Sequence, residues 1–208
     1  MDAANSALAD TTCAFCARQR LNGVLEETEH FFLLADHAPL IAGHLLVIPR
    51  THYACYGAVP QALESELLAI KERVRRFLSS AYREPVFFEH GVFRQTVYHA
   101  HLHAMPFGTV ALDLSALSHA AGQHADTLQD VRDWYARQGH YFYLECPAPE
   151  GSPSAALFPP NLDQYFHVLG ALRAATGTLT AWQPQPLRRM TSGDKVRALV
   201  ESWRSFAS

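Results

Sequence analysis

The chain has 208 residues, of which 49% are hydrophobic and 18% are charged, and its formal net charge is −3 at pH 7. This balance argues against intrinsic disorder and against a general nucleic-acid-binding surface. No segment is apolar for long enough to predict a membrane span, and residues 1–12 lack the basic and apolar regions of a secretory signal. We therefore expect a cytoplasmic protein with no membrane partner and no general nucleic-acid binding.

The first half of the chain predicts strands arranged around one long helix. Four strands are expected, at 24–27, 31–34, 43–49 and 85–89. Apolar residues recur at helical spacing over 60–81 and predict an amphipathic helix with Pro60 in its first turn. We therefore expect an α+β fold in which helices pack on an antiparallel sheet.

Beyond Gly108 the pattern changes to a mixture of helix and strand. Helices are expected at 126–138, 161–176 and 192–206, a strand at 141–145 and a loop at 147–154. Gly177 is the expected stop of the second helix, and Ser192 is the expected cap of the third. We expect one domain over 1–108 and a mixed helix and strand extension over 109–208 that packs on it.

The most informative segment is 97–105, in which His99, His101 and His103 alternate with apolar residues. As a strand, this segment would place the three imidazoles on one face and an apolar anchor on the other. An imidazole can serve as a nucleophile, a proton carrier, a hydrogen-bond donor to phosphate or a metal ligand. The alternative interpretations are a metal-chelating tract and an accidental exposed strand face.

Two blocks resemble the histidine triad (HIT) superfamily of nucleotide hydrolases and transferases. They are Gln95-Thr96-Val97-Tyr98-His99-Ala100-His101-Leu102-His103 and Gly43-His44-Leu45-Leu46-Val47-Ile48-Pro49. The chain is most similar to the zinc-containing bacterial branch, with a C-terminal extension. The resemblance implies an antiparallel sheet with a nucleotide, expected to be a purine nucleotide, lying across it, and a possible homodimer.

Carried over by position, the resemblance assigns roles to five residues. His101 would attack the α-phosphorus, so that a nucleotidyl-histidine forms and is then resolved by water or another acceptor. His103 and His44 would contact the phosphate or assist its protonation changes. Thr96 would lie near the leaving group, or would be an ordinary strand residue. Asp36 would bind ribose hydroxyls, or would only form a turn.

Cys13 and Cys16 form a Cys-x-x-Cys pair, which by itself is open to metal or redox use. In the resembling branch, the residues matching His52 and His99 complete a Cys2His2 zinc site. With four protein ligands, such a zinc ion is structural, because no position remains for a water molecule. We expect no organic cofactor.

The segment before the histidine block departs from the family pattern, which has Asn or Gln followed by a glycine-rich loop. Glu89 would repel a phosphate unless it is protonated, paired or directed at a cationic or hydroxylic leaving group. Arg94 would bind a phosphate through two hydrogen bonds from its guanidinium group, or would form an ion pair at the surface. Together with Gln95, both residues are expected to contact the substrate.

The resemblance leads to a nucleotide hydrolase that cleaves at the α-phosphate of a phosphoester, anhydride or phosphoramidate. The third histidine favours hydrolysis, since uridylyltransferase-like relatives usually have glutamine there. A nucleotidyltransferase or phosphorylase that uses the same intermediate is the first alternative, and a non-catalytic nucleotide-binding protein is the second. The extension, which carries Arg188 and Arg189, could narrow the substrate range or replace a dimer contact.

Overall fold

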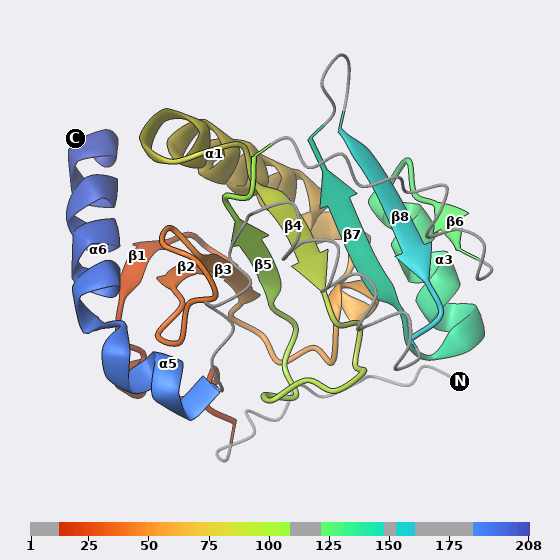
Figure 1. Cartoon of the computed structure of the whole chain (residues 1–208). Coiled ribbons are helices and arrows are strands. Elements are labelled where there is room, and N and C mark those ends of the chain that lie inside the picture. Colours follow the sequence, from red (N-terminus) through yellow and green to blue (C-terminus); the bar gives the residue numbers. More distant parts are fainter. Residues whose placement is uncertain (1–12, 109–121, 148–152, 161–184) are drawn as a thin grey trace.

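A computed structural model of the chain describes residues 13–108, 122–147, 153–160 and 185–208. The strands are β1 (Val24–Glu27), β2 (Phe31–Ala35), β3 (Leu45–Pro49), β4 (Val86–Glu89), β5 (Leu102–Met105), β6 (Gln123–His124), β7 (Phe142–Cys146) and β8 (Ser154–Phe158). They form one sheet in the order β1-β2-β3-β5-β4-β7-β8-β6, and every neighbouring pair is antiparallel (Figure 1). The expected antiparallel α+β fold is confirmed.

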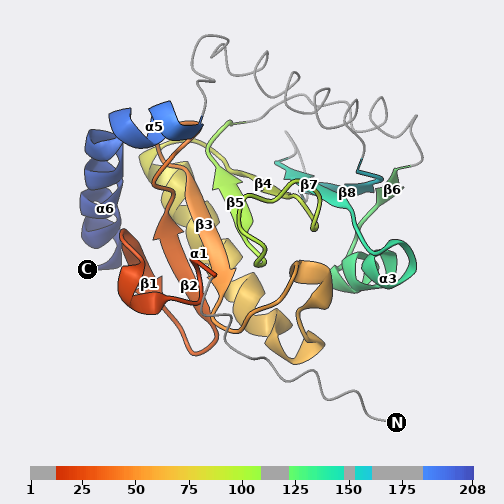
Figure 2. The same ribbon diagram turned by 90° about the horizontal axis from the view of Figure 1, so that it is seen from below.

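The helices are α1 (Glu64–Ala81), α3 (Leu128–Gln138), α5 (Gln185–Thr191) and α6 (Gly193–Ala207), with short 3-10 turns η1 (Arg18–Arg20), η2 (Tyr56–Ala58) and η3 (Gln61–Leu63). Figure 2 shows α1 and α3 on one side of the sheet and α5 toward the other. The predicted helix over 60–81 begins later than expected, because Pro60 precedes the turn η3 and α-helical geometry starts only at Glu64.

The two faces of the central strands bury different groups. Phe87, Leu102 and Ala104 pack with the apolar face of α1, and this core also takes in Trp134 of α3 and Trp203 of α6. The alternate positions of the same strands belong to a second apolar cluster, whose members include Phe88, Met105 and Phe142. Because successive side chains of a strand point to opposite faces, only every second residue of these strands can reach the face that α1 leaves uncovered.

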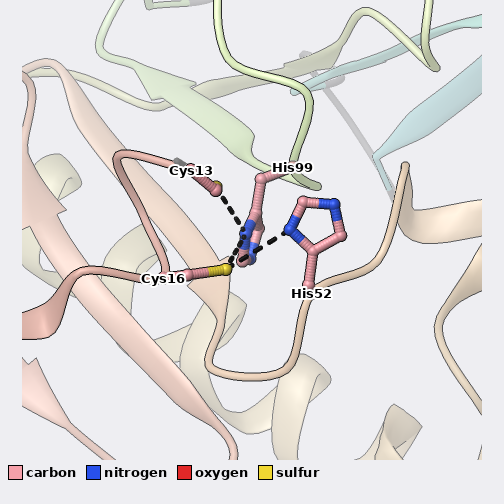
Figure 3. A group of neighbouring side chains, drawn as sticks. All are labelled: Cys13, Cys16, His52 and His99. Atoms are coloured by element: carbon pink, nitrogen blue, oxygen red, sulfur yellow. Dashed lines mark hydrogen bonds between the residues drawn. The ribbon is translucent and has the colours of Figure 1, made fainter. Parts of the chain in front are cut away.

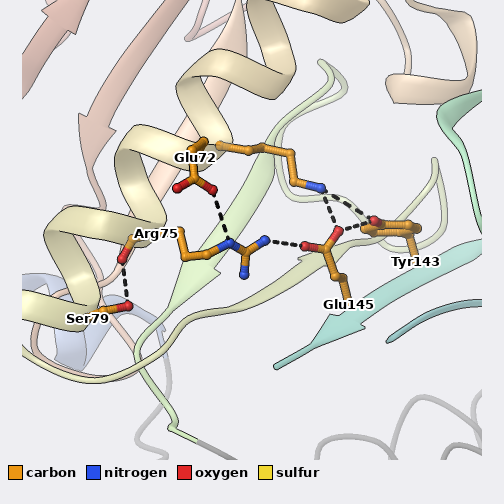
Figure 4. A network of polar contacts seen from close by, with 6 residues as sticks. Glu72, Arg75, Ser79, Tyr143 and Glu145 are labelled. Atoms are coloured by element: carbon orange, nitrogen blue, oxygen red, sulfur yellow. Dashed lines mark hydrogen bonds and ion pairs between the residues drawn. The ribbon is translucent and has the colours of Figure 1, made fainter. Parts of the chain in front are cut away.

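Strands from both halves of the chain share the sheet. β7 pairs with β4 through Phe88 and Leu144, so β4 is an interior strand. A polar network also ties β7 to α1, since Glu145 accepts hydrogen bonds from Lys71 at 2.5 Å and from Arg75 at 2.8 Å (Figure 4). The described parts of 109–208 thus pack on 13–108.

The extension agrees with expectation in part. α3, β7 and α6 match the predicted helices and strand, whereas β8 and α5 were not predicted. Ser192 stands at the N-cap position of α6 as expected, but its side chain makes no capping hydrogen bond. Thr127, in contrast, caps α3 in a reciprocal capping box with Asp130. The helix expected at 161–176 and its stop at Gly177 lie outside the described residues.

The predicted histidine strand is shorter than expected. β5 begins at Leu102, whose partner Val47 lies at the last paired position of β3. Before this point the chain turns, and the amide of His99 donates to the carbonyl of Val97 at 2.9 Å. Consequently only His103 of the three histidines lies within the strand. Among the described helices, none has the length and apolar character to cross a membrane.

Candidate active site

A cavity of about 770 Å³ opens on the sheet face that α1 leaves uncovered. Among the described residues, it is lined by six of the predicted site residues, namely Asp36, His44, Arg94, Thr96, His101 and His103. They come from the end of β2, from β5 and from the segments before β3 and β5. Residues of both sequence blocks that carry the HIT resemblance therefore meet in one place.

A chain of hydrogen bonds sets the proton positions on two histidines. The amide of Leu40 donates to Nδ1 of His44 at 3.2 Å, so neutral His44 carries its proton on Nε2. This Nε2 lies 2.9 Å from Nδ1 of His103 and donates to it. Neutral His103 must then carry its proton on Nε2, which is buried and has no partner among the described residues. An N–H donor is thus presented to the cavity.

His101 has the opposite arrangement. Its Nδ1 lies 2.6 Å from the carbonyl oxygen of His99, which can only accept, so the proton is on Nδ1. The lone pair of neutral His101 is consequently on Nε2, and the residue lines the cavity. The rings of His101 and His103 have centroids 5.0 Å apart. A ring nitrogen with a lone pair and an unpartnered ring N–H therefore belong to neighbouring histidines at the cavity.

Burial keeps these imidazoles neutral. It lowers the pKa of His103 well below the usual histidine value, and the neighbouring His101, His44 and His90 lower it further. Burial also lowers the pKa of His44, against an opposing effect of Asp36. The pKa of His101 is lowered by burial as well. The chain of hydrogen bonds from Leu40 through His44 to His103, called the donor chain below, requires neutral rings. It is therefore intact at neutral pH.

Asp36 makes the turn contact that its position suggested and also lines the cavity. Its Oδ1 accepts a hydrogen bond from the amide of Ala38 at 2.8 Å, which is the turn-forming contact. Its Oδ2 lies 3.3 Å from Nδ1 of His44, at the edge of the cavity. The turn thus holds one carboxylate oxygen while the other faces the histidines.

Two of the expected substrate contacts are corrected by the structure. Because Phe88 faces the cavity, its neighbour Glu89 faces the α1 side, where its Oε1 accepts from the amide of Tyr56 at 2.8 Å and its Oε2 from the hydroxyl of Tyr141. Burial raises the pKa of Glu89 to about 7. Gln95 is also buried and donates to the carbonyl of Ala54 at 3.2 Å. Neither side chain lines the cavity.

The loop that follows β4 brings Arg94 to the cavity at a cost in backbone strain. Val92 has φ 82° and Arg94 has φ 54°, and both values lie in the left-handed region that favours glycine. Gly91, with φ 51°, approaches the carbonyl oxygen of Tyr141 so closely that a Cβ would lie 2.3 Å from it. The glycine and the strained residues together direct the Arg94 side chain toward the histidines.

Cys13, Cys16, His52 and His99 form a compact cluster beside the cavity (Figure 3). Sγ of Cys13 lies 3.4 Å from Nδ1 of His99, and Sγ of Cys16 lies 3.3 Å from Nδ1 of His52 and 3.6 Å from Nδ1 of His99. A tetrahedral zinc ion would separate its sulfur and nitrogen ligands by about 3.5 Å. The four side chains therefore fit a metal ion of this kind.

A second contact supports His99 as a ligand. Its Nε2 lies 2.7 Å from the carbonyl oxygen of Pro49 and donates to it, so the lone pair is on Nδ1, which faces the sulfurs. The Cys13–Cys16 loop also reaches the cavity, because Phe15 between the two cysteines contacts His101 edge-on, with centroids 5.5 Å apart. The segment that carries the two cysteines therefore also forms part of the cavity lining, through Phe15.

Comparison with known proteins identifies the family. The HIT domain model matches residues 18–109. An uncharacterized 16.1 kDa HIT-like protein of Mycoplasma pneumoniae is 30% identical over 112 residues, which cover 48% of this chain and 74% of that protein. The chain belongs to the HIT family. HIT proteins bind nucleotides and are generally nucleotide hydrolases or transferases.

Solved HIT structures are similar to parts of the chain. A HIT family protein from Bacillus anthracis is 24% identical, covering 48% of this chain and 74% of its own, with a TM-score of 0.43. A Zn-bound histidine triad family protein from Mycobacterium smegmatis is also 24% identical, covering 61% and 94%, with a TM-score of 0.40.

Two further histidines and two further arginines of this HIT protein line the cavity although sequence reasoning did not place them there. They are His37, His90, Arg188 and Arg189. His90 stands directly after β4, and its ring centroid lies 5.8 Å from that of His103. The position of His90 beside a predicted strand was the only available signal. Arg188 and Arg189 contact residues about 150 positions earlier in the chain. Nothing in the sequence next to the two arginines indicated these contacts.

Proposed function

We propose that the protein is a nucleotide hydrolase that cleaves at the α-phosphate through a nucleotidyl-histidine intermediate on His101. The observation that carries this proposal is the pairing of a lone pair on Nε2 of His101 with a buried, unpartnered N–H on Nε2 of His103. The first group suits attack on phosphorus, and the second suits a phosphate oxygen that gains charge in the transition state.

In the first step, Nε2 of His101 forms a bond to phosphorus while the bond from phosphorus to the leaving oxygen or nitrogen breaks. The leaving group takes a proton from solvent, and the hydroxyl of Thr96 at the cavity is placed to donate a hydrogen bond to it. In the second step, water attacks phosphorus and releases a proton to solvent, the phosphorus–nitrogen bond breaks, and His101 returns to its neutral form. His44 supports the N–H of His103 by donating to its Nδ1, Asp36 at the cavity is available to accept from ribose hydroxyls, and Arg94 adds positive charge near the phosphate.

Product analysis tests the reaction class. The protein would be incubated with an adenylated amine, diadenosine polyphosphates and their guanine counterparts, with and without phosphate or a sugar phosphate. We expect a nucleoside monophosphate with wild type and no turnover with His101→Asn. The matched control is His140→Asn, an exposed histidine away from the cavity that should retain activity.

Two outcomes would replace the hydrolase proposal. If inorganic phosphate or a sugar phosphate is added to the nucleotide in place of water, the protein is a phosphorylase or nucleotidyltransferase that uses the same intermediate. If the whole panel binds without turnover, the protein is a non-catalytic nucleotide-binding protein.

We further propose that Cys13, Cys16, His52 and His99 hold a structural zinc ion. When bound, the ion would supply cross-linking between the N-terminal segment and the segment that leads to His101, without a position for an activated water. The other two cysteines differ, because burial raises the pKa of both Cys55 and Cys146 to about 12 and keeps them as thiols. Cys16→Ser should lose the metal and Cys146→Ser should retain it, as measured by elemental analysis. Equal zinc content in both variants would refute the site.

Residues 109–208 are proposed to be an extension of a HIT unit that spans 1–108. β7 of the extension pairs with β4, which is therefore not a free edge for a second copy. A homodimer would have to use another surface, and sedimentation analysis of the purified protein would reveal it.

A further inference from the structure

The extension supplies two arginines to the candidate active site. Nε of Arg188 donates to the carbonyl of Ala38 at 3.0 Å, and the guanidinium of Arg189 contacts Nε2 of His37. Both arginines come from α5, and both line the cavity that contains His44 and His101. In Figure 2, α5 lies on the side of the sheet away from α1. The extension is therefore part of the site and not only a neighbour of it.

These arginines occupy one rim of the cavity. Ala38 lies just beyond the end of β2, and β3 separates β2 from β5, which carries His103. Two strand spacings amount to about 10 Å. The backbone that Arg188 contacts therefore lies about two strands from His103, so the pair lines the β2 side of the cavity.

The charges that line the cavity are unbalanced. Among its described lining residues are three arginines, Arg94, Arg188 and Arg189, and one carboxylate, Asp36. Burial lowers the pKa of His44 and of His90, so these rings add no charge at neutral pH. The described lining thus has a formal charge of about +2, from three guanidinium groups and one carboxylate. The described lining therefore favours an anionic substrate.

The charge of each arginine also acts on a neighbouring histidine. Burial is the main reason for the lowered pKa of His37, and the charge of Arg189 lowers it further. Arg188 acts in the same direction on the pKa of His44, again after burial. Because positive charge from α5 reaches both histidines, it also reaches an anion bound between them.

We propose that Arg188 and Arg189 form a subsite for a second phosphate group, so that the preferred substrate is a nucleotide with at least two phosphates. This inference rests on the proposed function, because it takes the histidines as the site of the first phosphate. Guanidinium groups pair with phosphate through charge-assisted hydrogen bonds, which are stronger than neutral ones. The second phosphate can be the next one in a polyphosphate chain or one on the ribose, and ligand choice separates the two.

Calorimetric titration tests the subsite in a His101→Asn background, where turnover is blocked. The ligands are adenosine monophosphate, adenosine diphosphate, and an adenosine bisphosphate with its second phosphate on a secondary ribose hydroxyl. We expect at least one of the two-phosphate ligands to bind about tenfold more tightly than the monophosphate. Arg188→Gln and Arg189→Gln should each reduce this preference about tenfold. Arg197→Gln is the matched control, since Arg197 is exposed on α6 and pairs with Asp194.

Each outcome decides the question. Preference for the diphosphate identifies a polyphosphate subsite, and preference for the bisphosphate identifies a ribose-phosphate subsite. Equal affinity for all three ligands overturns the subsite, as does an equal loss of affinity for all three in both arginine variants. If wild type still hydrolyses the adenylated amine, the proposed function survives that result. If no nucleotide binds and none is turned over, both proposals fail. Arg189 is exposed, so its replacement tests the subsite without disturbing a core.

Discussion

Replacing Glu89 by Gln should change how the stability of the protein depends on pH. Burial is the main reason why the pKa of Glu89 is raised from 4.5 to about 7, and hydrogen bonds from Tyr141 and Tyr56 only partly oppose this effect. Between these two values the folded state binds more protons than the unfolded state. The stabilising effect of the proton is therefore fully present below about pH 4.5 and is lost as the pH rises through about 7.

The size of the effect follows from the two pKa values. One pKa unit corresponds to about 1.4 kcal/mol, and the range from pH 5 to pH 9 covers most of the titration. The free energy of unfolding of wild type, relative to that of Glu89→Gln, should therefore fall by roughly 2–3 kcal/mol over that range. Comparing the two proteins cancels the contributions of the other titrating groups, including the histidines of the cavity.

Urea denaturation at several pH values measures this difference. Glu145→Gln is the control. Burial opposes the charge of Glu145, but its ion pairs with Lys71 and Arg75 lower its pKa, so this carboxyl completes its titration below the measured range. The Glu145→Gln difference should therefore be flat. Parallel stability curves for wild type and Glu89→Gln would refute the assignment of a buried, protonatable carboxyl at this position.

Two further predictions concern a helix cap and the pH dependence of turnover. Thr127→Ala removes the capping box of α3 and should reduce the free energy of unfolding by about 1 kcal/mol, as measured by urea denaturation; an unchanged midpoint would show that the cap is dispensable. Turnover should stay constant from about pH 8 down to about 6.5, the usual histidine pKa, and fall only below it, because burial lowers the pKa of His103 and of His44 and keeps the donor chain neutral. A loss of activity that begins above about pH 7 would contradict this interpretation.

The sequence predicted those parts of the fold that have a local signal. The period of α1 and the position of β3 between Gly43 and a final proline are properties of neighbouring residues, and both predictions agree with the structure. The start of β5 depends instead on where β3 stops pairing with it. Because that limit lies at Leu102, the alternation of the histidines overstated the length of the strand.

Two features of the site depend on contacts that the sequence does not display. β4 is buried on both faces, so its apolar residues do not reveal that Phe88 faces the cavity and Glu89 faces away. Arg188 reaches the cavity only because α5 lies against the turn that contains Ala38. Long-range packing of this kind leaves no periodic pattern near either residue.

The most direct test of the account is detection of the covalent intermediate. The protein would be mixed with an adenylated amine, quenched within the first turnover without acid, and analysed by intact and peptide mass spectrometry. We predict one nucleotidyl group per chain, located on His101, that disappears with time and is absent from His101→Asn. Turnover without this adduct, or an adduct on His103 or His44, would contradict the assignment of His101 as the nucleophile.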